Sequence, residues 1–321
     1  MADLALTCAI KDYDHIAPLR AGDVKPEGVA LSFDFGPDVL NRVVNLPDVQ
    51  VGELSFGRYL IRVASGDRSI VGLPIFTTCL FRQRCFYVGQ ASRLQALADL
   101  AGTRIGTNEW PATGNTWARA ALREQGVDVA SIAWSVGTVD GPSPGSVKDP
   151  LPAHVRPAPA GRSLREMLLA GELDALMIAY PPEGFYRPDS AIRRLIPDWV
   201  GAEKAYLARV GYIPAHHVMG IKRSLVEQQP WVVKSLFDAF DRSKRLWQEG
   251  RLKLTDTTPW ILAEIEEART LVGEDWQPYG VVPNRAVIAA LCQEQYAQGL
   301  VEKPLDPAAA FADFERIVPG V

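Results

Sequence analysis

The side chains best suited to proton transfer lie in three short segments. His216 and His217 are adjacent in one segment, Glu53 precedes Ser55 in another, and His15 lies near the N-terminus. Histidine changes its charge near neutral pH, so it is the side chain most easily used to donate or accept a proton. In an extended segment His216 and His217 point to opposite faces, so only one of them faces a given site. These residues therefore predict general acid–base chemistry.

Each of these residues also has a structural explanation. His217 fits a core histidine whose hydrogen bonds are satisfied inside the protein. Glu53 fits an ion pair or a contact with a helix N-terminus, as well as a group that accepts a proton or orients a histidine. In the sequence Tyr13-Asp14-His15, the aspartate fits a cap of the following turn.

Two arginines are candidates to hold a carboxylate ligand. The planar guanidinium of Arg82 matches a carboxylate through two parallel hydrogen bonds. Arg84 lies on the same face as Arg82 if residues 81–86 form a strand. An ordinary surface charge is the alternative for both arginines.

A second anion site is predicted at the start of a helix. Thr113, Gly114 and Asn115 open an alanine-rich segment that is predicted to be helical, and the first amides and the dipole of a helix attract an anion. Plain helix capping is the alternative. Glu109 and Trp110 come just before this segment, and the indole either stacks on an aromatic ligand or packs in the core.

Short apolar segments alternate with helix-like segments along most of the chain. Strands are predicted at 4–10, 29–35, 50–54, 104–106 and 174–179. Ser55 is the predicted N-cap of a helix over 59–64, and apolar spacing predicts further helices at 231–248, 259–271 and 284–298. This pattern predicts an α/β protein with mainly parallel sheets flanked by helices. Ligands of such sheets bind beyond the carboxyl ends of the strands.

Composition argues against two classes of partner. The 321 residues are 47% hydrophobic and 22% charged, with a formal net charge of −4, which does not suit a nucleic-acid-binding protein. No apolar run reaches the ~20 residues of a membrane-spanning helix, so no membrane partner is expected. A chain of this length predicts two lobes, and a homo-oligomer is compatible with its sequence.

The N-terminal residues lack the basic and apolar regions of an export signal, which favours a cytoplasmic protein. The four cysteines have no metal-ligand spacing and fit buried thiols. Neither a dinucleotide fingerprint nor a phosphate loop is present. We therefore predict neither an organic cofactor nor a metal, although His15, Glu53 and His217 would be the ligands of a divalent metal if they converge.

Several loop motifs occur in a characteristic order over most of the chain. They are Tyr13-Asp14-His15, Glu53-Leu54-Ser55, Pro74-Ile75-Phe76, Phe81-Arg82, Glu109-Trp110, Gly171-Glu172-Leu173-Asp174, and Pro214 leading to His217. In order and spacing these motifs resemble the 4,5-dihydroxyphthalate decarboxylase family, relatives of the type II periplasmic binding proteins. Two positions depart from the family pattern, because Cys79 and Gln83 stand where members commonly carry an arginine and a histidine.

The resemblance implies a two-lobed type II periplasmic-binding-protein-like fold with a ligand cleft between the lobes. Lobe 1 would comprise residues 1–88 and 213–321, and lobe 2 residues 89–212. Hinge strands are expected near 86–90 and 210–216.

The resemblance also implies a carboxy-lyase that acts on a hydroxylated aromatic dicarboxylate such as 4,5-dihydroxyphthalate. Direct loss of CO2 would leave an unstable aryl carbanion. Protonation of the carboxylate-bearing carbon, with loss of the proton from the para hydroxyl, avoids this intermediate. His217 matches the family position and is the expected catalytic histidine, with Glu53 and His15 as further catalytic groups.

The expected partner is a small aromatic carboxylate. Its expected contacts are Tyr13, Asp14, Ser55, Arg82, Arg84, Glu109, Trp110, Thr113, Gly114, Asn115 and His216. The alternative function is a solute-binding protein for an aromatic or other organic acid, without catalysis, and a third is a ligand-sensing domain. The missing export signal and the number of titratable side chains favour the enzyme.

Overall fold

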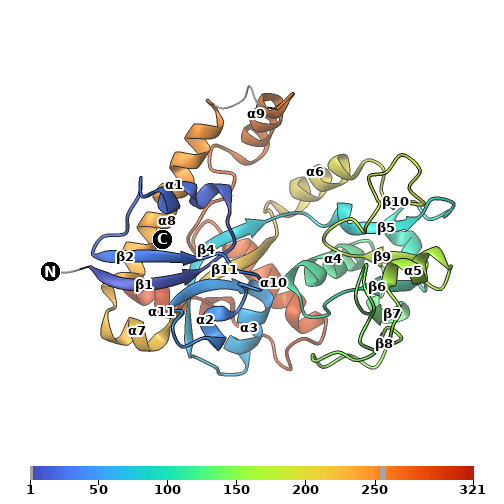
Figure 1. The fold of residues 1–321 in the computed structure, drawn as a ribbon, viewed down its shortest axis with the longest axis horizontal. Helices are drawn as coiled ribbons and strands as arrows, with labels where there is room; N and C mark the ends of the chain where they lie inside the picture. Colours follow the sequence, from blue (N-terminus) through green and yellow to red (C-terminus); the bar gives the residue numbers. More distant parts are fainter. Residues whose placement is uncertain (1–2, 254–257) are drawn as a thin grey trace. The chain divides into compact units, whose positions relative to one another are not determined.

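The computed structural model describes residues 3–253 and 258–321 and divides the chain into two compact units. The first unit comprises Met1–Cys79, Ala215–Ala289 and Leu305–Val321. The second unit comprises Leu80–Pro214 and Ala290–Pro304. Each unit is built on one β-sheet (Figure 1).

The sheet of the first unit has five strands in the order β2-β1-β3-β11-β4. β1 is parallel to β2 and β3, whereas β11, by which the chain returns to this unit, is antiparallel to β3 and β4. β3 is buried along its whole length, as expected of a central strand. The strands are β1 (Leu4–Ala9), β2 (Val29–Asp34), β3 (Val51–Ser55), β4 (Ile70–Cys79) and β11 (Ala215–Lys222).

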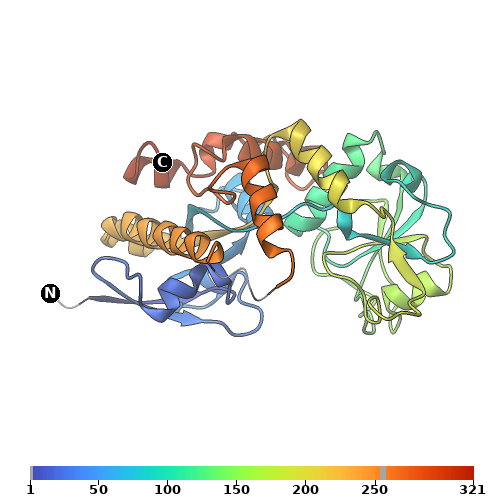
Figure 2. The same cartoon turned by 90° about the horizontal axis from the view of Figure 1, so that it is seen from above.

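Helices with one apolar face pack on this sheet. In α3, Phe56, Tyr59, Leu60 and Val63 recur at helical spacing and are buried. α8, which Figure 2 shows along its length, contacts α1 and β4. The helices of this unit are η1 (Asp14–Ile16), α1 (Ala17–Ala21), α2 (Arg42–Asn45), α3 (Phe56–Ala64), α7 (Arg223–Gln228), α8 (Trp231–Arg251), α9 (Ile261–Val272), η6 (Pro307–Ala309) and α11 (Ala312–Ile317). α10 (Arg285–Ala297) begins in the first unit and ends in residues assigned to the second.

The sheet of the second unit has six strands in the order β10-β5-β9-β6-β7-β8. The pairs made by β6 with β7 and β9, and by β7 with β8, are parallel, whereas β5 is antiparallel to β9 and β10. The strands are β5 (Phe86–Gly89), β6 (Arg104–Thr107), β7 (Ala133–Val136), β8 (Val155–Pro157), β9 (Ala175–Met177) and β10 (Ile192–Arg194). The helices are η2 (Gln83–Cys85), η3 (Leu97–Leu100), α4 (Thr113–Glu124), η4 (Val129–Ser131), α5 (Leu164–Leu169) and α6 (Trp199–Val210).

Both faces of the second sheet are covered by apolar clusters. Along β5, Phe86 and Val88 belong to one cluster and Tyr87 to the other. Along β9, Met177 joins the first cluster and Leu176 the second. This alternation follows from the two-residue period of a strand.

The predicted α/β class with mainly parallel sheets is confirmed, and antiparallel pairs occur where β5 and β11 join the sheets. The predicted helices at 231–248, 259–271 and 284–298 correspond to α8, α9 and α10. The division into units differs from the predicted lobe boundaries at two places. Residues 80–88 belong to the second unit, because β5 pairs with β9 and β10, and residues 290–304 belong there as well.

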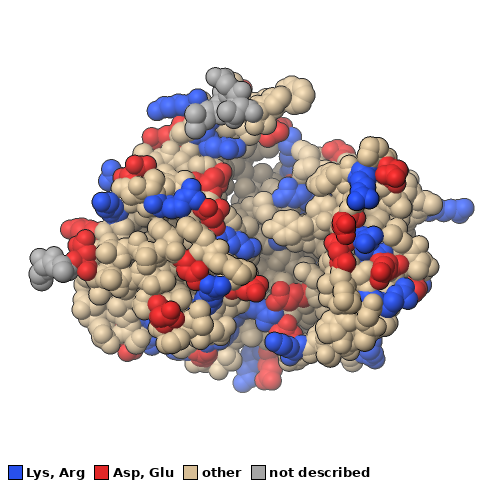
Figure 3. All heavy atoms as spheres, viewed as in Figure 1, with Lys and Arg blue, Asp and Glu red and all other residues tan. Residues whose placement is uncertain are grey.

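Charged side chains of both signs are interspersed over the face shown in Figure 3. Among the helices of the described residues, none combines the length and the hydropathy that a membrane-spanning helix needs.

A close contact joins β4 to α3 in the first unit. The hydroxyl of Tyr59 accepts a hydrogen bond from the Gly72 amide (3.1 Å) and donates one to the carbonyl of Ala310 (2.6 Å). A Cβ atom at residue 72 would lie 2.5 Å from the Tyr59 hydroxyl oxygen. Only glycine therefore fits at this position of β4.

We expect Gly72→Ala to lower the free energy of unfolding by about 1–3 kcal/mol, because the buried ring of Tyr59 has to shift. The control is Gly250→Ala in α8, where an added Cβ meets nothing within 4 Å. The control should be neutral or stabilising by about 0.5–1 kcal/mol, since alanine favours a helix. Urea unfolding measures both variants, and equal effects would contradict this account of the contact.

Candidate functional site

A fully buried carboxylate is the centre of a hydrogen-bonded cluster in the first unit. Glu53 is 0% exposed and lies on β3. Its Oε1 atom lies 2.6 Å from the Tyr13 hydroxyl, 2.9 Å from Thr77 Oγ1 and 2.6 Å from His217 Nδ1. Its Oε2 atom accepts the backbone amide of Lys11 at 3.1 Å. Glu53 thus joins groups from the segment after β1, from β4 and from β11.

These contacts keep Glu53 ionised. Burial by itself would raise the pKa of Glu53, but the hydrogen bond and charge of His217, with the hydrogen bonds from Tyr13 and Lys11, outweigh burial and lower the pKa to about 2. An ionised carboxylate only accepts hydrogen bonds, so His217 Nδ1 carries the proton that it shares with Glu53. The ring nitrogen left to meet a ligand is therefore Nε2 of His217.

The backbone of β11 is irregular where it carries His217. Its register against β4 shifts between Ala215 and His217 and again between His217 and Met219. Irregularities of this kind re-aim side chains and are common beside functional sites. The side chain of His217 is 17% exposed, whereas its neighbour His216 is buried. The alternation predicted for this pair is therefore observed.

His15 is a buried neighbour of the cluster and has no direct contact with Glu53 among the described interactions. Its ring stacks on Tyr13 at a centroid distance of 5.1 Å and meets Trp247 edge-on at 6.0 Å. Burial lowers the pKa of His15 to about 4, although the charges of Asp14 and Glu53 act in the opposite direction. His15 is therefore neutral at neutral pH, and its ring stacks on Tyr13. Its role in proton transfer stays a prediction.

Ser55 and Asp14 were also predicted to contact the substrate. Ser55 is buried at the start of α3, in register with His217 on the neighbouring strand. Asp14 opens η1 with a side chain that is 62% exposed, 3.9 Å from His15 Nδ1 and 4.0 Å from Arg251 Nη1. Its side chain points to solvent, and the cap that was its alternative explanation is not observed, because Tyr13 is the N-cap residue of η1 and no side-chain cap hydrogen bond is made there.

Two threonines of the cluster were not among the predicted residues. Thr77 donates to Glu53, and Thr78 Oγ1 donates to the Tyr13 hydroxyl at 2.8 Å. Both follow the apolar run of β4, where threonine is an ordinary strand residue. A pair of polar residues at the end of an apolar strand was the available signal.

In the second unit, Arg82 lies against the first turn of α4. A Cβ atom at Gly114 would lie 2.3 Å from Arg82 Nη2 and 2.6 Å from its Cζ. The guanidinium therefore rests directly on the backbone of the helix start, where amides and dipole favour an anion. The prediction assigned Arg82 to lobe 1, but the structure assigns it to the same unit as α4, because the chain crosses to the second unit at residue 80.

Other predicted residues around α4 stabilise its start. Asn115 Nδ2 donates to Asn108 Oδ1 at 3.1 Å and to the Glu109 carbonyl at 2.7 Å, which fastens the loop between β6 and α4. Thr113 is the first residue of α4 and is buried, whereas the Glu109 side chain is exposed.

Trp110 and Arg84 were predicted to contact the ligand, and in the structure both contact other side chains of the protein. The Trp110 ring is 2% exposed and packs under the Arg119 guanidinium at 3.9 Å and against Trp134 at 5.4 Å. It is a core residue and has no exposed face on which a ligand would stack. Arg84 lies 3.8 Å from Glu203 of α6, and the segment that holds it is the 3-10 helix η2 in place of the predicted strand.

Across residues 3–253 and 258–321, no three side chains of His, Cys, Asp or Glu form a group able to hold a metal ion. Of the three residues named as metal ligands, Glu53 and His217 do meet, whereas His15 stacks on Tyr13.

The shifted pKa of His15 makes the stability of the protein depend on pH. In the unfolded chain His15 binds a proton below about pH 6.5, whereas in the folded protein it does so only below about pH 4. Stability is therefore lost as the pH falls from 6.5 to 4, by about 3 kcal/mol for this group. We expect His15→Gln to be less stable at pH 7 but to lose less stability over this interval. Urea unfolding at pH 6.5, 5 and 4 measures how the free energy of unfolding changes with pH in the wild type and in the variant. The same change in both proteins would refute this pKa shift.

One relative of known activity covers almost the whole chain, and a second covers two thirds of it. No family model matches it. The 4,5-dihydroxyphthalate decarboxylase of Comamonas testosteroni is 31% identical over 323 residues, which are 97% of this chain and 97% of that protein. A protein of the same name from Pseudomonas putida is 29% identical over 220 residues, 66% of this chain and 84% of that protein.

Solved structures show the same fold at low sequence identity. The periplasmic aliphatic sulphonate binding protein of Escherichia coli has a TM-score of 0.55 at 15% identity and covers 96% of this chain and 92% of its own. The alkanesulfonate-binding protein of Xanthomonas axonopodis pv. citri has a TM-score of 0.52 at 15% identity and covers 97% of this chain and 98% of its own. A Candida albicans protein described as having the generic periplasmic binding protein fold has a TM-score of 0.51 at 12% identity and covers 98% of this chain and 95% of its own. The chain thus has a periplasmic-binding-protein-like fold, and its sequence places it in the 4,5-dihydroxyphthalate decarboxylase family.

Proposed function

We propose that this protein removes CO2 from a hydroxylated aromatic dicarboxylate such as 4,5-dihydroxyphthalate. The observation that carries the proposal is the pair made by His217 Nδ1 and the buried Glu53 carboxylate at 2.6 Å. This pair leaves one ring nitrogen of a partly exposed histidine for proton transfer. Both relatives with known names are decarboxylases of this substrate class.

The reaction replaces a carbon–carbon bond by a carbon–hydrogen bond. A proton is added to the ring carbon that bears the departing carboxylate, while the hydroxyl para to it gives up its proton and becomes a carbonyl. The bond to the carboxylate then breaks, its electron pair returns to the ring, and CO2 leaves. The ring regains its aromaticity, and the oxygen takes up a proton again. Net, one proton is consumed for each CO2 released, and no oxidant or reductant is needed.

His217 Nε2 is the donor of the proton to the ring carbon. Glu53 holds the ring of His217 in place and fixes a proton on Nδ1, because its Oε1 atom binds Nδ1. Glu53 is fully buried and accepts four hydrogen bonds, so it orients His217 and does not itself exchange protons with substrate. Tyr13 and Thr78 extend the polar chain beyond Glu53 and are the groups we assign to the phenolic oxygen.

Within the second unit, Arg82 and the start of α4 are suited to bind a carboxylate. The guanidinium supplies a positive charge and paired donors, and the helix start supplies backbone amides.

Replacing His217 by alanine should reduce kcat for 4,5-dihydroxyphthalate by about 10²–10⁴-fold, the usual contribution of a general acid. Binding of phthalate, which lacks the hydroxyls, should persist in this variant. His154→Gln in the second unit is the matched histidine control and should keep the wild-type rate. CO2 release measures turnover, and calorimetry measures binding.

A wild-type rate in His217→Ala would remove His217 from the mechanism. The wild-type protein can also be tested with several hydroxylated benzene dicarboxylates. Binding of these compounds with no CO2 released from any of them would instead favour the solute-binding alternative. The sulphonate-binding proteins with this fold are the reason to keep that alternative in the test.

We expect Arg82→Ala to weaken phthalate binding by about 10–100-fold, because a charge-assisted hydrogen-bonded pair is lost. Arg84→Ala is the matched control. Arg84 lies two residues away but interacts with Glu203, so its loss should change phthalate affinity by less than about threefold. Equal losses in the two variants would show that Arg82 has no special role in holding the carboxylate.

A further inference from the structure

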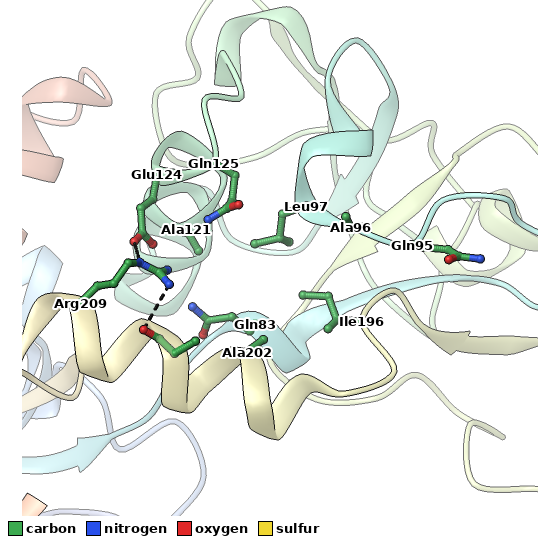
Figure 4. A pocket seen from close by; sticks show the side chains of 11 residues that line it. Gln83, Gln95, Ala96, Leu97, Ala121, Glu124, Gln125, Ile196, Ala202 and Arg209 are labelled. Carbon is green, nitrogen blue, oxygen red and sulfur yellow. Dashed lines mark hydrogen bonds and ion pairs between the residues drawn. The ribbon is translucent and has the colours of Figure 1, made fainter. Parts of the chain in front are cut away.

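A cavity of about 270 Å³ lies within the second unit, between helices α4 and α6. Figure 4 shows it with the side chains that line it. α4 contributes Ala121 and the residues at its C-terminal end, whereas Arg82 rests on the opposite, N-terminal end of the same helix. The cavity is therefore distinct from the carboxylate-holding groups, and the mechanism makes no use of it.

The inner wall of the cavity is apolar except for one amide. Leu97 and Ala121 are buried, and Ile196 lies beside them. Gln83 is 5% exposed and reaches into the space between α4 and α6 (Figure 4). Its Oε1 atom accepts the backbone amide of Arg82 at 3.1 Å, which fixes the direction of the side chain. A buried amide in an apolar wall provides an oriented polar contact for a ligand.

The charges at the mouth of the cavity cancel. Arg209 Nε donates to Glu124 Oε1 at 2.7 Å, and its Nη1 atom donates to the Ala205 carbonyl. An anionic ligand would have to compete with Glu124 for Arg209, and a cationic one with Arg209 for Glu124. Gln95 and Gln125 add uncharged donors and acceptors at the exposed edge. An uncharged ligand does not compete with either side chain of this ion pair.

We propose that this cavity is a second binding site, for an uncharged molecule with a single ring and an amide or hydroxyl substituent. Its volume lies just below the usual range for drug-sized ligands, which suits one ring. The ring packs on Leu97, Ala121 and Ile196, and the polar substituent pairs with Gln83. Amide and hydroxyl substituents satisfy the same Gln83 contact, and the two probes below distinguish them.

The test is ligand-observed NMR titration of the full-length protein with benzamide and with phenol. Ala205→Phe places a ring in the cavity from an exposed position of α6 and should weaken binding of the better probe at least tenfold. Ala208→Phe, one turn along the same helix and outside the lining, is the matched control and should bind within twofold of wild type. Gln83→Leu keeps the bulk and removes the amide, so it should weaken binding by about 3–10-fold.

Two further measurements make the proposal refutable. Benzoate should bind at least tenfold more weakly than benzamide, and equal affinity would overturn the inferred preference for uncharged ligands. His217→Gln should leave benzamide affinity unchanged, and a loss of binding there would assign the molecule to the acid–base cluster instead. No binding of either probe by wild type, or wild-type affinity in Ala205→Phe, would overturn the site itself. None of these measurements requires decarboxylation, so their outcome does not depend on whether the proposed reaction occurs.

Discussion

The buried charge of Glu53 is the constraint on which the first unit is organised. A carboxylate without exposure is costly unless donors surround it, and the donors here come from three different parts of the chain. Lys11 and Tyr13 follow β1, Thr77 lies on β4, and His217 lies on β11. These donors meet only when the strands are in their observed order, so the same interactions that compensate the charge also assemble the acid–base cluster.

In the second unit, the main constraint is the position of a cation, Arg82, at the start of helix α4. The guanidinium of Arg82 occupies the space that a side chain at residue 114 would fill, so glycine is needed there for steric reasons. The 3-10 turn of η2 and the hydrogen bond from the Arg82 amide to Gln83 hold the backbone that carries this arginine. Backbone geometry, more than side-chain charge alone, determines where this positive group lies.

The sequence predicted the fold class, and it pointed to Glu53 and His217 through motifs shared with a known family. The structure brings these two side chains into contact. The sequence did not predict Thr77 or Thr78, since threonine in a strand is ordinary and only the folded sheet shows what these hydroxyls contact. Trp110 illustrates another limit, because an indole looks the same in a sequence whether it packs in a core or faces a ligand. The lobe boundaries implied by the family resemblance placed Arg82 in lobe 1, whereas the structure assigns it to the second unit. The 3-10 turn at 83–85 that follows it has no clear sequence pattern.

The two histidines near Tyr13 differ in what their surroundings allow. Burial lowers the pKa of His15 to about 4, so at neutral pH this ring is uncharged, and it stacks on Tyr13. His217 instead donates from Nδ1 to a carboxylate that stays ionised down to about pH 2. Its partial exposure leaves Nε2 accessible, and the irregular pairing of β11 sets its direction. Burial and the choice of neighbour thereby leave one histidine packed in the interior and the other partly exposed beside a carboxylate.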